Sequence, residues 1–411
     1  METFFQKAKV ASSIISTLSS AKKVKILNEF ADILEDNIKT IENENKKDLD
    51  YANEHNLSSA MVDRLLLDKT RVQGMAKSIR EIASLKEPVG IVQDGWSVES
   101  GISIQKVSVP IGVIGIIYES RPNVTSDTAS LCFKSGNVAI LKGGKEAYNS
   151  NKIIASLLQD VLEKNSLPKE IISLLPDSSR AGVDKMIKMD RYVDLIIPRG
   201  GEALIRYVNE NSTVPVVKHD KGLCHTYIHK DANIDMAVKV AINAKCRRVG
   251  ICNAMETLLV DKDIAKEVLP LLKAEFDKFE TTLKGCNTTS SIIDVEDATQ
   301  EDYDTEYLAN ILSIKIVDGV DEAIEHIAKY GSGHSEAIIT NSVKDSEEFL
   351  NKVDAACVYL NASTQFTDGG EFGFGAEVGI STNKLHSRGP MGINDLTTYK
   401  YKIYGNGNTR K

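Results

Sequence analysis

Residues 137–175 read NVAILKGGKEAYNSNKIIASLLQDVLEKNSLPKEIISLL, and this stretch decides the fold. Its two ends, residues 137–142 and 171–175, are short apolar runs of the kind that form buried strands. Between them, residues 149–164 have the spacing of an amphipathic helix. The apolar side of that helix carries Ile153, Ile154, Leu157, Leu158, Val161 and Leu162. Strand, helix and strand in this order predict a parallel sheet that is covered on both faces.

Further apolar runs extend the same pattern. They are IGVIGIIY (111–118), VDLII (193–197) and VPVV (214–217), which we expect to be strands of the same nucleotide-binding α/β sheet. No G-x-G-x-x-G follows any of these strands, so a conventional Rossmann pyrophosphate turn is not expected. The nearest phosphate-friendly segments are residues 142–145 and 198–201, at carboxyl ends of strands, where open α/β sheets bind ligands.

The segments on either side of this pattern differ in character. The first 85 residues read as helical, with Val24, Leu27, Ala31 and Leu34 on one face. Residues 91–108 are β-rich with two turn signals, which predicts a projecting hairpin suited to contact another subunit. The tail TTYKYKIYG (397–405) alternates like a strand, and we expect it to pair with this hairpin.

A second unit is expected from about residue 232. Residues 232–248 read as a helix, VGICN (249–253) as a short loop and METLLV (255–260) as a strand. Residues 361–394 are rich in Gly, Ser, Thr and Asn and are typical of a long functional loop. The predicted domains are therefore residues 1–231 for the cofactor, 232–361 for catalysis, and 362–411 for a substrate loop and an oligomerisation strand.

Composition narrows the class of function. The formal charge of the 411 residues is −8 without a basic block, which disfavours nucleic acid as a partner. The chain shows neither a cleaved leader nor a membrane-spanning run, so we expect a soluble cytoplasmic protein. Six dispersed cysteines without C-x-x-C and seven dispersed histidines without H-x-x-H predict no metal site.

Cys252 is the cysteine with the most suggestive surroundings. It lies in a tight helix-to-strand connection after Lys245, Arg247 and Arg248, and nearby cations favour the reactive thiolate. On these grounds alone, a small buried filler is the commoner role for such a residue. No histidine is adjacent, so a Cys–His protease pair has no local support.

Six motifs in unbroken order add a resemblance that covers nearly the whole chain. They are YESRPNVTSD (118–127), ILKGG (140–144), NAK (243–245) with VGICNAMETLLV (249–260), YGSGHSEAIIT (330–340), NASTQFTDGGEFGFGAEVGIST (361–382) and LHSRGPMG (385–392). Together they resemble the gamma-glutamyl phosphate reductases, also called glutamate-5-semialdehyde dehydrogenases, of the aldehyde dehydrogenase superfamily. The resemblance implies a fold with a parallel-sheet cofactor domain, an α/β catalytic domain and a β-hairpin arm for homo-oligomerisation.

The resemblance also implies a reaction, the second step of proline biosynthesis from glutamate. Cys252 would attack L-glutamyl 5-phosphate, phosphate would leave, and NADPH would reduce the thioester to glutamate 5-semialdehyde. Asn123 matches the oxyanion asparagine of the superfamily, and one such donor is worth about 3 kcal/mol of transition-state stabilisation. The residues leave open whether a separate glutamate 5-kinase associates to pass on its labile product.

Cofactor and substrate residues are carried over in the same way. Lys142 matches the lysine that reaches the adenosine ribose, Lys145 would neutralise a 2′-phosphate and so favours NADPH, and Glu306 matches the glutamate that holds the nicotinamide ribose. The other expected cofactor contacts are Gly143, Gly144, Arg199, Gly200 and Gly201. The expected substrate contacts are Arg121, His225, Ser381, Thr382 and Arg388, with Arg388 the first choice because Arg binds carboxylates bidentately.

Two departures from the family pattern keep alternatives open. The family usually has N-A-K-T-Q-R-P, where this chain has Cys246, Arg247 and Val249, and it usually has Arg where this chain has Gln365. A catalytically silent binding protein of the same fold is therefore one alternative. A hydrolytic aldehyde dehydrogenase is another, but the segment expected to carry its general-base Glu, VVKHDKGLCHTYI (216–228), has none.

Overall fold

The chain folds into two compact units in the computed structural model, which describes residues 1–217 and 221–410. Unit 1 comprises Met1–Lys218, Gly373–Gly379 and Met391–Lys411, and unit 2 comprises His219–Phe372 and Ile380–Pro390. The first unit thus ends earlier than the expected residue 231, because the strand that follows it pairs within the sheet of unit 2. The segment 362–411 is shared between both units and is not a separate part.

The predicted parallel sheet forms the centre of unit 1. Its order is β5-β4-β3-β6, and every pairing is parallel. The strands are β3 (Val113–Tyr118), β4 (Val138–Lys142), β5 (Ile172–Leu174) and β6 (Leu195–Arg199). The expected fifth strand at 214–217 is wrong: only a single parallel bridge joins Val216 to Ile196. Pro215 explains this, because proline has no N–H to donate to a ladder.

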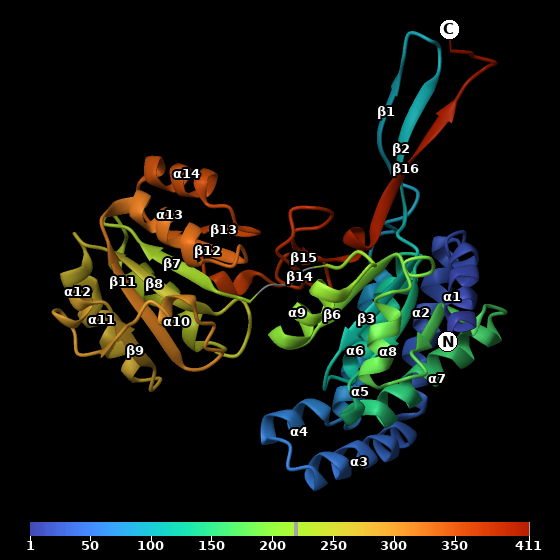
Figure 1. The fold of residues 1–411 in the computed structure, drawn as a ribbon, viewed down its shortest axis with the longest axis horizontal. Helices are drawn as coiled ribbons and strands as arrows, with labels where there is room; N and C mark the ends of the chain where they lie inside the picture. Colours follow the sequence, from blue (N-terminus) through green and yellow to red (C-terminus); the bar gives the residue numbers. More distant parts are fainter. Residues whose placement is uncertain (218–220, 411) are drawn as a thin grey trace. The chain divides into compact units, whose positions relative to one another are not determined.

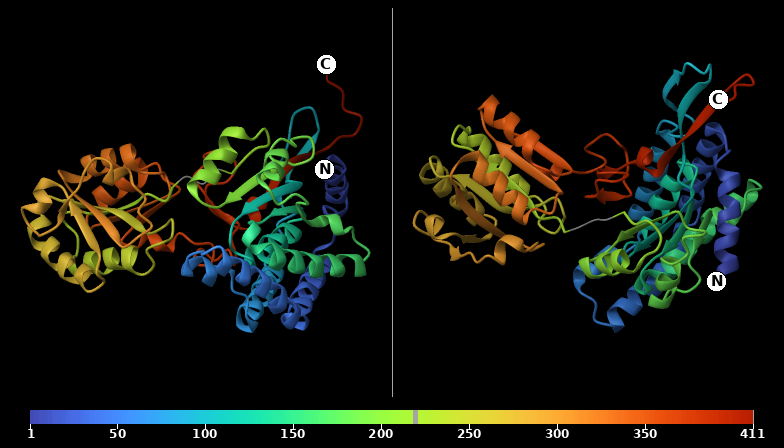
Figure 2. Two further views of the ribbon diagram at one scale, coloured as in Figure 1. Left: turned by 60° about the horizontal axis from the view of Figure 1, so that its bottom comes forward. Right: turned by 45° about the horizontal axis from the view of Figure 1, so that its top comes forward.

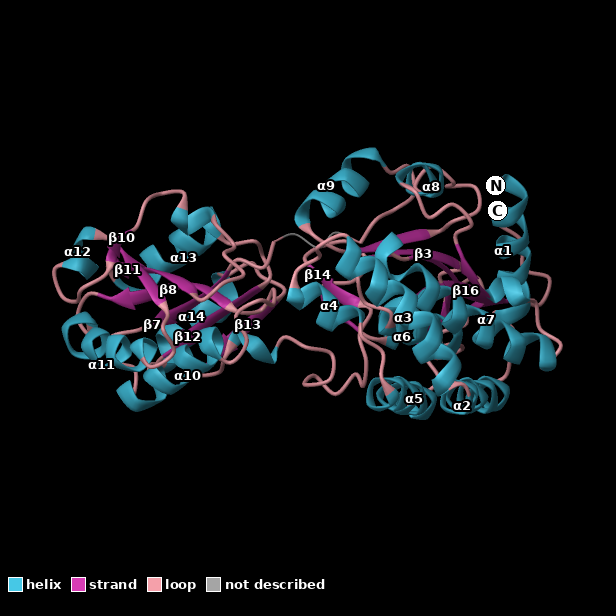
Figure 3. Ribbon diagram, turned by 90° about the horizontal axis from the view of Figure 1, so that it is seen from below, coloured by secondary structure: helices cyan, strands magenta, loops and turns pink. Residues whose placement is uncertain are grey.

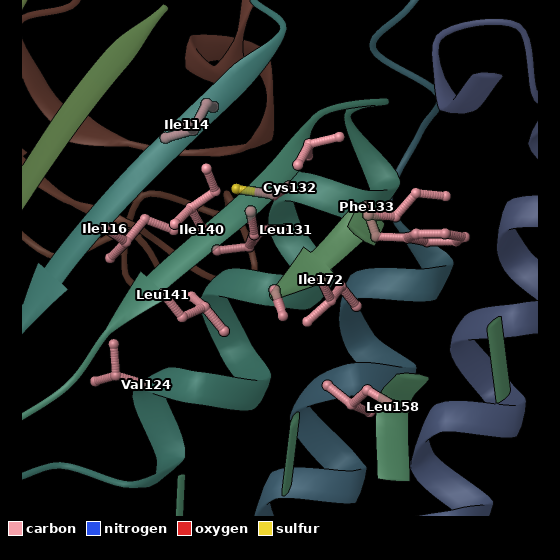
Figure 4. Close-up of a cluster of buried hydrophobic side chains, with 14 of the residues drawn as sticks. Ile114, Ile116, Val124, Leu131, Cys132, Phe133, Ile140, Leu141, Leu158 and Ile172 are labelled. Carbon is pink, nitrogen blue, oxygen red and sulfur yellow. The ribbon is translucent and has the colours of Figure 1, made fainter. Parts of the chain in front are cut away.

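Helices cover both faces of this sheet (Figures 1 and 3). Those of the helical N-terminal region are α1 (Glu2–Ile15), α2 (Ser20–Asp36), α3 (Ile38–Glu54), α4 (Ser59–Leu65) and α5 (Lys69–Ser84), as the sequence predicts. The others are α6 (Asn123–Lys134), α7 (Tyr148–Lys164), α8 (Arg180–Met186) and α9 (Glu202–Asn211), with short turns η1 (Lys145–Ala147) and η2 (Lys169–Ile171). Figure 4 shows the core between sheet and helices, where Ile116 and Ile140 lie near Leu131 of α6.

A three-stranded antiparallel arm extends from the rest of unit 1 (Figures 1 and 2). It consists of β1 (Val92–Ser97), β2 (Ser103–Pro110) and β16 (Thr397–Tyr404), in the order β1-β2-β16. The tail pairs with the hairpin along its whole length, from Thr397 opposite Pro110 to Tyr404 opposite Ser103. Both the hairpin and its pairing with the tail are therefore confirmed.

Unit 2 is a second parallel sheet with the order β10-β9-β11-β8-β7-β12-β13. Its strands are β7 (Cys224–Ile228), β8 (Met255–Asp261), β9 (Thr282–Gly285), β10 (Glu296–Asp297), β11 (Ile311–Val317), β12 (Ser335–Ile339) and β13 (Cys357–Leu360). Its helices are α10 (Ile234–Cys246), α11 (Ala265–Asp277), α12 (Asn287–Ser290), α13 (Gly319–Tyr330) and α14 (Val343–Lys352). Alternate side chains of β8 face opposite cores: Leu258 packs with α10 and α11, and Leu259 with α13 and α14.

The polar segment 361–394 is mainly loop, as expected. It contains the turns η4 (Thr364–Phe366) and η5 (Ile393–Leu396) and two short strands, β14 (Gly379–Ser381) and β15 (Gly389–Met391). A further short turn, η3 (Asp302–Asp304), precedes β11 in unit 2. No helix of the described part of the chain combines the length and hydrophobicity needed to cross a bilayer.

Candidate active site

Cys252 lies in the turn between α10 and β8 and is half-buried. The backbone of Gly222 packs directly against it: a Cβ at residue 222 would lie 1.9 Å from the Cys252 carbonyl oxygen and 2.4 Å from its Cα. The thiol of Cys224, at the start of β7, donates to the same carbonyl oxygen at 3.2 Å. Contacts from Gly222 and from Cys224 of β7 therefore hold the turn that contains Cys252. Only glycine fits at residue 222.

Glu306 is joined to the same turn through Gly222. Its Oε1 accepts a hydrogen bond from the Gly222 N–H at 2.9 Å, and its side chain is half-buried before β11. The structure thus brings two predicted site residues, Cys252 and Glu306, into contact with one glycine. Gly222 itself was not predicted, because nothing in the local sequence shows which backbone it touches.

A buried ion pair lies close to this turn in sequence. The Lys245 ammonium is 2.6 Å from Glu256 Oε2, and both side chains are fully buried. Glu256 Oε1 also accepts from the Leu308 N–H at 3.2 Å. Burial raises the pKa of Glu256 to about 7 and lowers the pKa of Lys245. The expectation that Lys245 supplies positive charge to the thiolate is wrong in this respect, because Glu256 neutralises that charge.

The two departures from the family pattern meet in space. Arg247 NH1 donates to Gln365 Oε1 at 3.0 Å, and Gln365 Nε2 donates to the Ala244 carbonyl at 2.8 Å. Asn253, the residue after Cys252, donates to the Thr367 carbonyl at 2.9 Å. These bonds fasten the segment around residue 365 to both sides of the cysteine turn.

Cys246, the second thiol near the turn, has different surroundings. Its sulfur lies 3.5 Å from the hydroxyl oxygen of Thr281, and burial raises the pKa of its thiol. A thiol with a raised pKa is less often a thiolate, so it is a poorer nucleophile at neutral pH. The structure therefore offers no catalytic role for Cys246.

The expected substrate residues of unit 2 are dispersed. His225 is fully buried in β7, with Nδ1 2.9 Å from Glu336 Oε2, so its position supports packing and not substrate binding. Arg388 is ion-paired with Asp354 at 2.7 Å. Ser381 is buried and accepts from the Asn383 N–H at 3.2 Å, and Thr382 is half-buried.

Asn123 belongs to unit 1, where it begins α6 and is exposed. Its amide nitrogen donates to Asp127 Oδ2 at 3.1 Å, one helical turn away. Both residues line a cavity of about 270 Å³, to which α4 contributes Arg64. Arg121 is exposed just before α6. The four-residue spacing of Asn123 and Asp127 could have indicated the pair, whereas Arg64 lies in a helical region without any motif.

The expected cofactor residues of unit 1 gather at the carboxyl edge of its sheet. Lys142 ends β4 and Arg199 ends β6, on either side of β3. Burial lowers the pKa of Lys142, while the neighbouring carboxylates of Glu146, Glu119 and Asp177 act in the opposite direction. These acids were not predicted. The Arg199 guanidinium donates to the carbonyl oxygens of residues 377 and 378, which holds the C-terminal loop of the same unit.

The glycines of the two cofactor loops have different surroundings. A Cβ at Gly143 would lie 2.1 Å from Asn151 Nδ2, one at Gly144 2.0 Å from Glu146 Oε1, and one at Gly200 2.7 Å from Leu204. A side chain at any of these three positions would therefore require Asn151, Glu146 or Leu204 to move. Only Gly201 has open space around it, which leaves its backbone approachable.

Lys145 is exposed and lines a cavity of about 530 Å³ together with Lys47 and Tyr148. The carboxylates of Asp48, Asp50 and Glu54 line the same cavity, so its lining carries charges of both signs.

One grouping of metal-ligating residues was not expected from sequence spacing. His229, Asp231 and Asp345 place their ligand atoms within 4.8 Å of one another. His229 Nδ1 already contacts the Thr340 hydroxyl at 2.9 Å, and Nε2 lies 3.6 Å from Asp345. His229 Nδ1 also accepts a hydrogen bond from the Asp231 N–H at 3.3 Å, so this nitrogen already has partners within the protein.

Comparison with known proteins agrees with this geometry. The Aldehyde dehydrogenase family model matches residues 1–285 and 277–401. The chain is 67% identical over 410 residues to the gamma-glutamyl phosphate reductase of Sulfurimonas denitrificans and 67% identical over 412 residues to that of Nitratiruptor sp., each match covering 100% of both chains. The crystal structure of gamma-glutamyl phosphate reductase from Thermotoga maritima superimposes with a TM-score of 0.98 at 45% identity, covering 100% of this chain and 99% of that one. The chain belongs to the gamma-glutamyl phosphate reductases of the Aldehyde dehydrogenase family.

Proposed function

We propose that this protein reduces L-glutamyl 5-phosphate to L-glutamate 5-semialdehyde and phosphate with NADPH, in the proline biosynthesis pathway. The observation that carries the proposal is the half-buried Cys252, whose turn is packed on Gly222, with Glu306 bonded to the same glycine. The relatives that match the chain from end to end bear the name of this activity.

Cys252 carries the acyl group through the reaction. The thiolate sulfur forms a bond to C5 of the substrate, the C5–O bond to phosphate breaks, and phosphate leaves with that electron pair. The resulting thioester accepts a hydride at C5. The tetrahedral thiohemiacetal then loses the C–S bond, which yields the aldehyde and returns the thiolate. Sulfur suits both roles because it is a good nucleophile and a good leaving group.

Asn123 would stabilise the oxyanion that forms at C5. Its amide donates one N–H to Asp127, which fixes the orientation of the amide and leaves the second N–H for the substrate oxygen. A fixed donor aimed at a developing negative charge typically contributes about 3 kcal/mol. Asn123 and Cys252 belong to different units, so this role is assigned from chemistry and the family match.

Lys142, Lys145, Gly201 and Glu306 are the residues that would hold the cofactor. Members of the Aldehyde dehydrogenase family use nicotinamide cofactors, and NADPH supplies the hydride when it is bound. Lys145 is the residue that favours NADPH over NADH, because an exposed ammonium can pair with the 2′-phosphate. Glu306 would accept from a ribose hydroxyl, as its match to the glutamate of the family implies.

A reductase must not hydrolyse its thioester, so its active site should lack a general base that activates water. The acidic residue Glu256 near the cysteine turn is consistent with this requirement. Both oxygens of Glu256 are engaged, one by Lys245 and one by the Leu308 N–H, so this buried carboxylate is a poor general base. The segment expected to carry the base of a hydrolytic enzyme has no Glu, although its residues 218–220 lie outside the described part of the chain. Acyl-phosphate reduction is therefore favoured over hydrolysis.

The direct test is oxidation of glutamate semialdehyde with and without phosphate, with NADP⁺ and NAD⁺ compared. We expect phosphate-dependent reduction of NADP⁺, a lower rate with NAD⁺, and no turnover by Cys252→Ser. Cys246→Ser is the matched control and should keep its activity, because that thiol packs against Thr281. Turnover independent of phosphate would favour the hydrolytic enzyme, and equal negligible rates for the wild type and Cys252→Ser would favour the silent binding protein.

The arm supports a second proposal, that the protein forms a homo-oligomer. Trp96 on β1 and Tyr399, Tyr401 and Ile403 on β16 are all at least 41% exposed. A small sheet with exposed aromatic and aliphatic side chains needs a covering surface, and a second copy of the chain supplies one. Light scattering of Trp96→Ser with Ile403→Ser should show a smaller assembly than the wild type; an unchanged mass would contradict this role of the arm.

A further inference from the structure

Apart from Asn123 and its partner Asp127, the residues that line the cavity beside Asn123 have no role in the steps described above. The cavity has a volume of about 270 Å³ and is lined mainly by residues of α4, α5 and α6 of unit 1. Its polar lining consists of Arg64, Arg71, Ser78, Asn123 and Asp127. The volume is at the lower end of the range for small-molecule sites, roughly 300–1,000 Å³, and suits part of a small ligand.

The two arginines of this cavity differ in what they already bind. Arg71 is committed to its own unit: it is ion-paired with Asp63 at 2.7 Å and donates to the Leu66 carbonyl at 3.1 Å. Arg64 is exposed, and no hydrogen bond or ion pair with a described residue engages its guanidinium. Arg64 is therefore the cation of the cavity that remains available to an anionic group.

Asp127 supplies the opposite charge. Its Oδ2 accepts from Asn123, while its Oδ1 is buried and accepts no hydrogen bond from the described residues. A buried carboxylate oxygen without a donor is costly. Burial raises the pKa of Asp127 to about 6, while Asn123, the Ser78 hydroxyl and the charge of Arg199 each act in the opposite direction. A ligand that brings a positively charged donor would satisfy this oxygen.

We propose that this cavity binds the α-amino acid head of the substrate, with Arg64 pairing with the α-carboxylate and Asp127 accepting from the α-ammonium. The inference rests on the proposed function and adds the residues that recognise the glutamyl group. One cavity thus contains a guanidinium that can bind an anion and a carboxylate oxygen that lacks a hydrogen-bond donor. Together these two groups complement the opposite charges of a zwitterion. An inorganic phosphate would match Arg64 but would be repelled by Asp127.

Asn123 connects this cavity to the chemistry within unit 1. It lines the cavity, and its amide is the expected donor to the oxygen on C5. In a glutamyl group C5 is three bonds from the α-carbon, so a head held by Arg64 and Asp127 leaves the reacting carbonyl near the Asn123 end of the cavity. The helical spacing of Asn123 and Asp127 fixes these two contacts relative to each other.

The test compares three aldehydes that differ only in the head. Glutamate semialdehyde has both charged groups, 5-oxopentanoate lacks the ammonium, and 4-aminobutanal lacks the carboxylate. Each is oxidised with NADP⁺ and phosphate by the wild type, Asp127→Asn, Arg64→Gln and the control Lys77→Gln, which changes an exposed lysine of α5 that does not line the cavity. Thermal unfolding of each variant checks that it is folded.

We expect the loss of activity in each variant to depend on whether the aldehyde carries the group that the substituted residue binds. With glutamate semialdehyde, Asp127→Asn and Arg64→Gln should each lower kcat/KM by roughly 10- to 100-fold, which is the value of one charged hydrogen bond. The loss in Asp127→Asn should shrink at least severalfold with 5-oxopentanoate, and the loss in Arg64→Gln should shrink similarly with 4-aminobutanal. Lys77→Gln should behave as the wild type with all three aldehydes.

Equal losses with all three aldehydes, or no loss in either variant, would overturn the proposal that this cavity binds the α-amino acid head of the substrate. A loss in Arg64→Gln that appears only as a higher KM for phosphate would identify the cavity as a phosphate site and would also overturn it. A wild type that oxidises none of the aldehydes would instead contradict the proposed function, so the two failures are distinguishable.

Discussion

Arg247 donates a hydrogen bond from its guanidinium to the side-chain oxygen of Gln365 at 3.0 Å, across 118 residues of sequence. The family usually has Gln at the first position and Arg at the second. At residues 247 and 365 the cation and the amide have therefore changed places across the same contact. This exchange accounts for part of the support for a silent protein of the same fold, while Cys246 and Val249 remain departures that it does not explain.

A double-mutant cycle tests the exchange. Arg247→Gln loses one hydrogen bond and should cost about 1 kcal/mol of unfolding free energy in urea. Gln365→Arg places two cations together and should cost more, while the double variant should recover most of the loss because the pair is restored in reverse. Additive losses in the double variant would argue against the exchange. Arg206→Gln, which breaks an exposed pair with Glu202, is a control expected to change little.

Gly222→Ala tests how the cysteine turn is held. The new methyl group would overlap the Cys252 backbone, with 1.9 Å to its carbonyl oxygen, so the turn must move. We expect a fall in kcat/KM of roughly 10²-fold, because small misplacements of reacting groups are that costly. Gly250→Ala in the same turn is the matched control, since its nearest neighbour would lie at an ordinary 3.6 Å. Equal effects of the two changes would show that Gly222 has no special role.

Lys145→Gln tests the preference for NADPH. Loss of a charged contact to the 2′-phosphate should raise the KM for NADPH by roughly 10- to 100-fold and leave the KM for NADH almost unchanged. Lys152→Gln, on the adjoining helix α7 but outside the cavity lined by Lys145, should change neither value. A parallel rise in both KM values would place Lys145 away from the 2′-phosphate.

Asp127→Asn should stabilise the fold in a pH-dependent way. Burial holds the pKa of Asp127 at about 6 in the folded chain, above the ordinary value of 3.8. The folded state therefore binds more protons than the unfolded state between these values, and stability falls as the pH rises through this window. The variant should be more stable by roughly 2 kcal/mol above pH 6 and equal to the wild type below about pH 4. A pH-independent difference in urea midpoints would contradict the burial of a charged group.

The spacing of apolar residues was sufficient to predict those helices and strands whose formation depends on the local sequence. The strand–helix–strand pattern of residues 137–175 and the alternating tail both describe local structure, and both are confirmed. The error at 214–217 has a local cause too, since Pro215 weakens an otherwise apolar strand.

The candidate site depended on partners that are distant in sequence, which a single sequence does not reveal. Lys245 looked like a free cation, but Glu256 on the following strand neutralises it. His225 looked polar enough to bind substrate, but β7 is buried and turns it toward Glu336. Gly222 and Arg64 carried no motif, and only tertiary packing shows what they contact.

The most direct test of the account is the amount of NADPH formed when the enzyme is mixed rapidly with glutamate semialdehyde and NADP⁺ in the absence of phosphate. If Cys252 carries a thioester that only phosphate releases, NADPH should form in a burst of about one equivalent per chain and then stop until phosphate is added. Cys252→Ser should show no burst. Steady NADPH formation without phosphate, or a burst that persists in Cys252→Ser, would contradict the account.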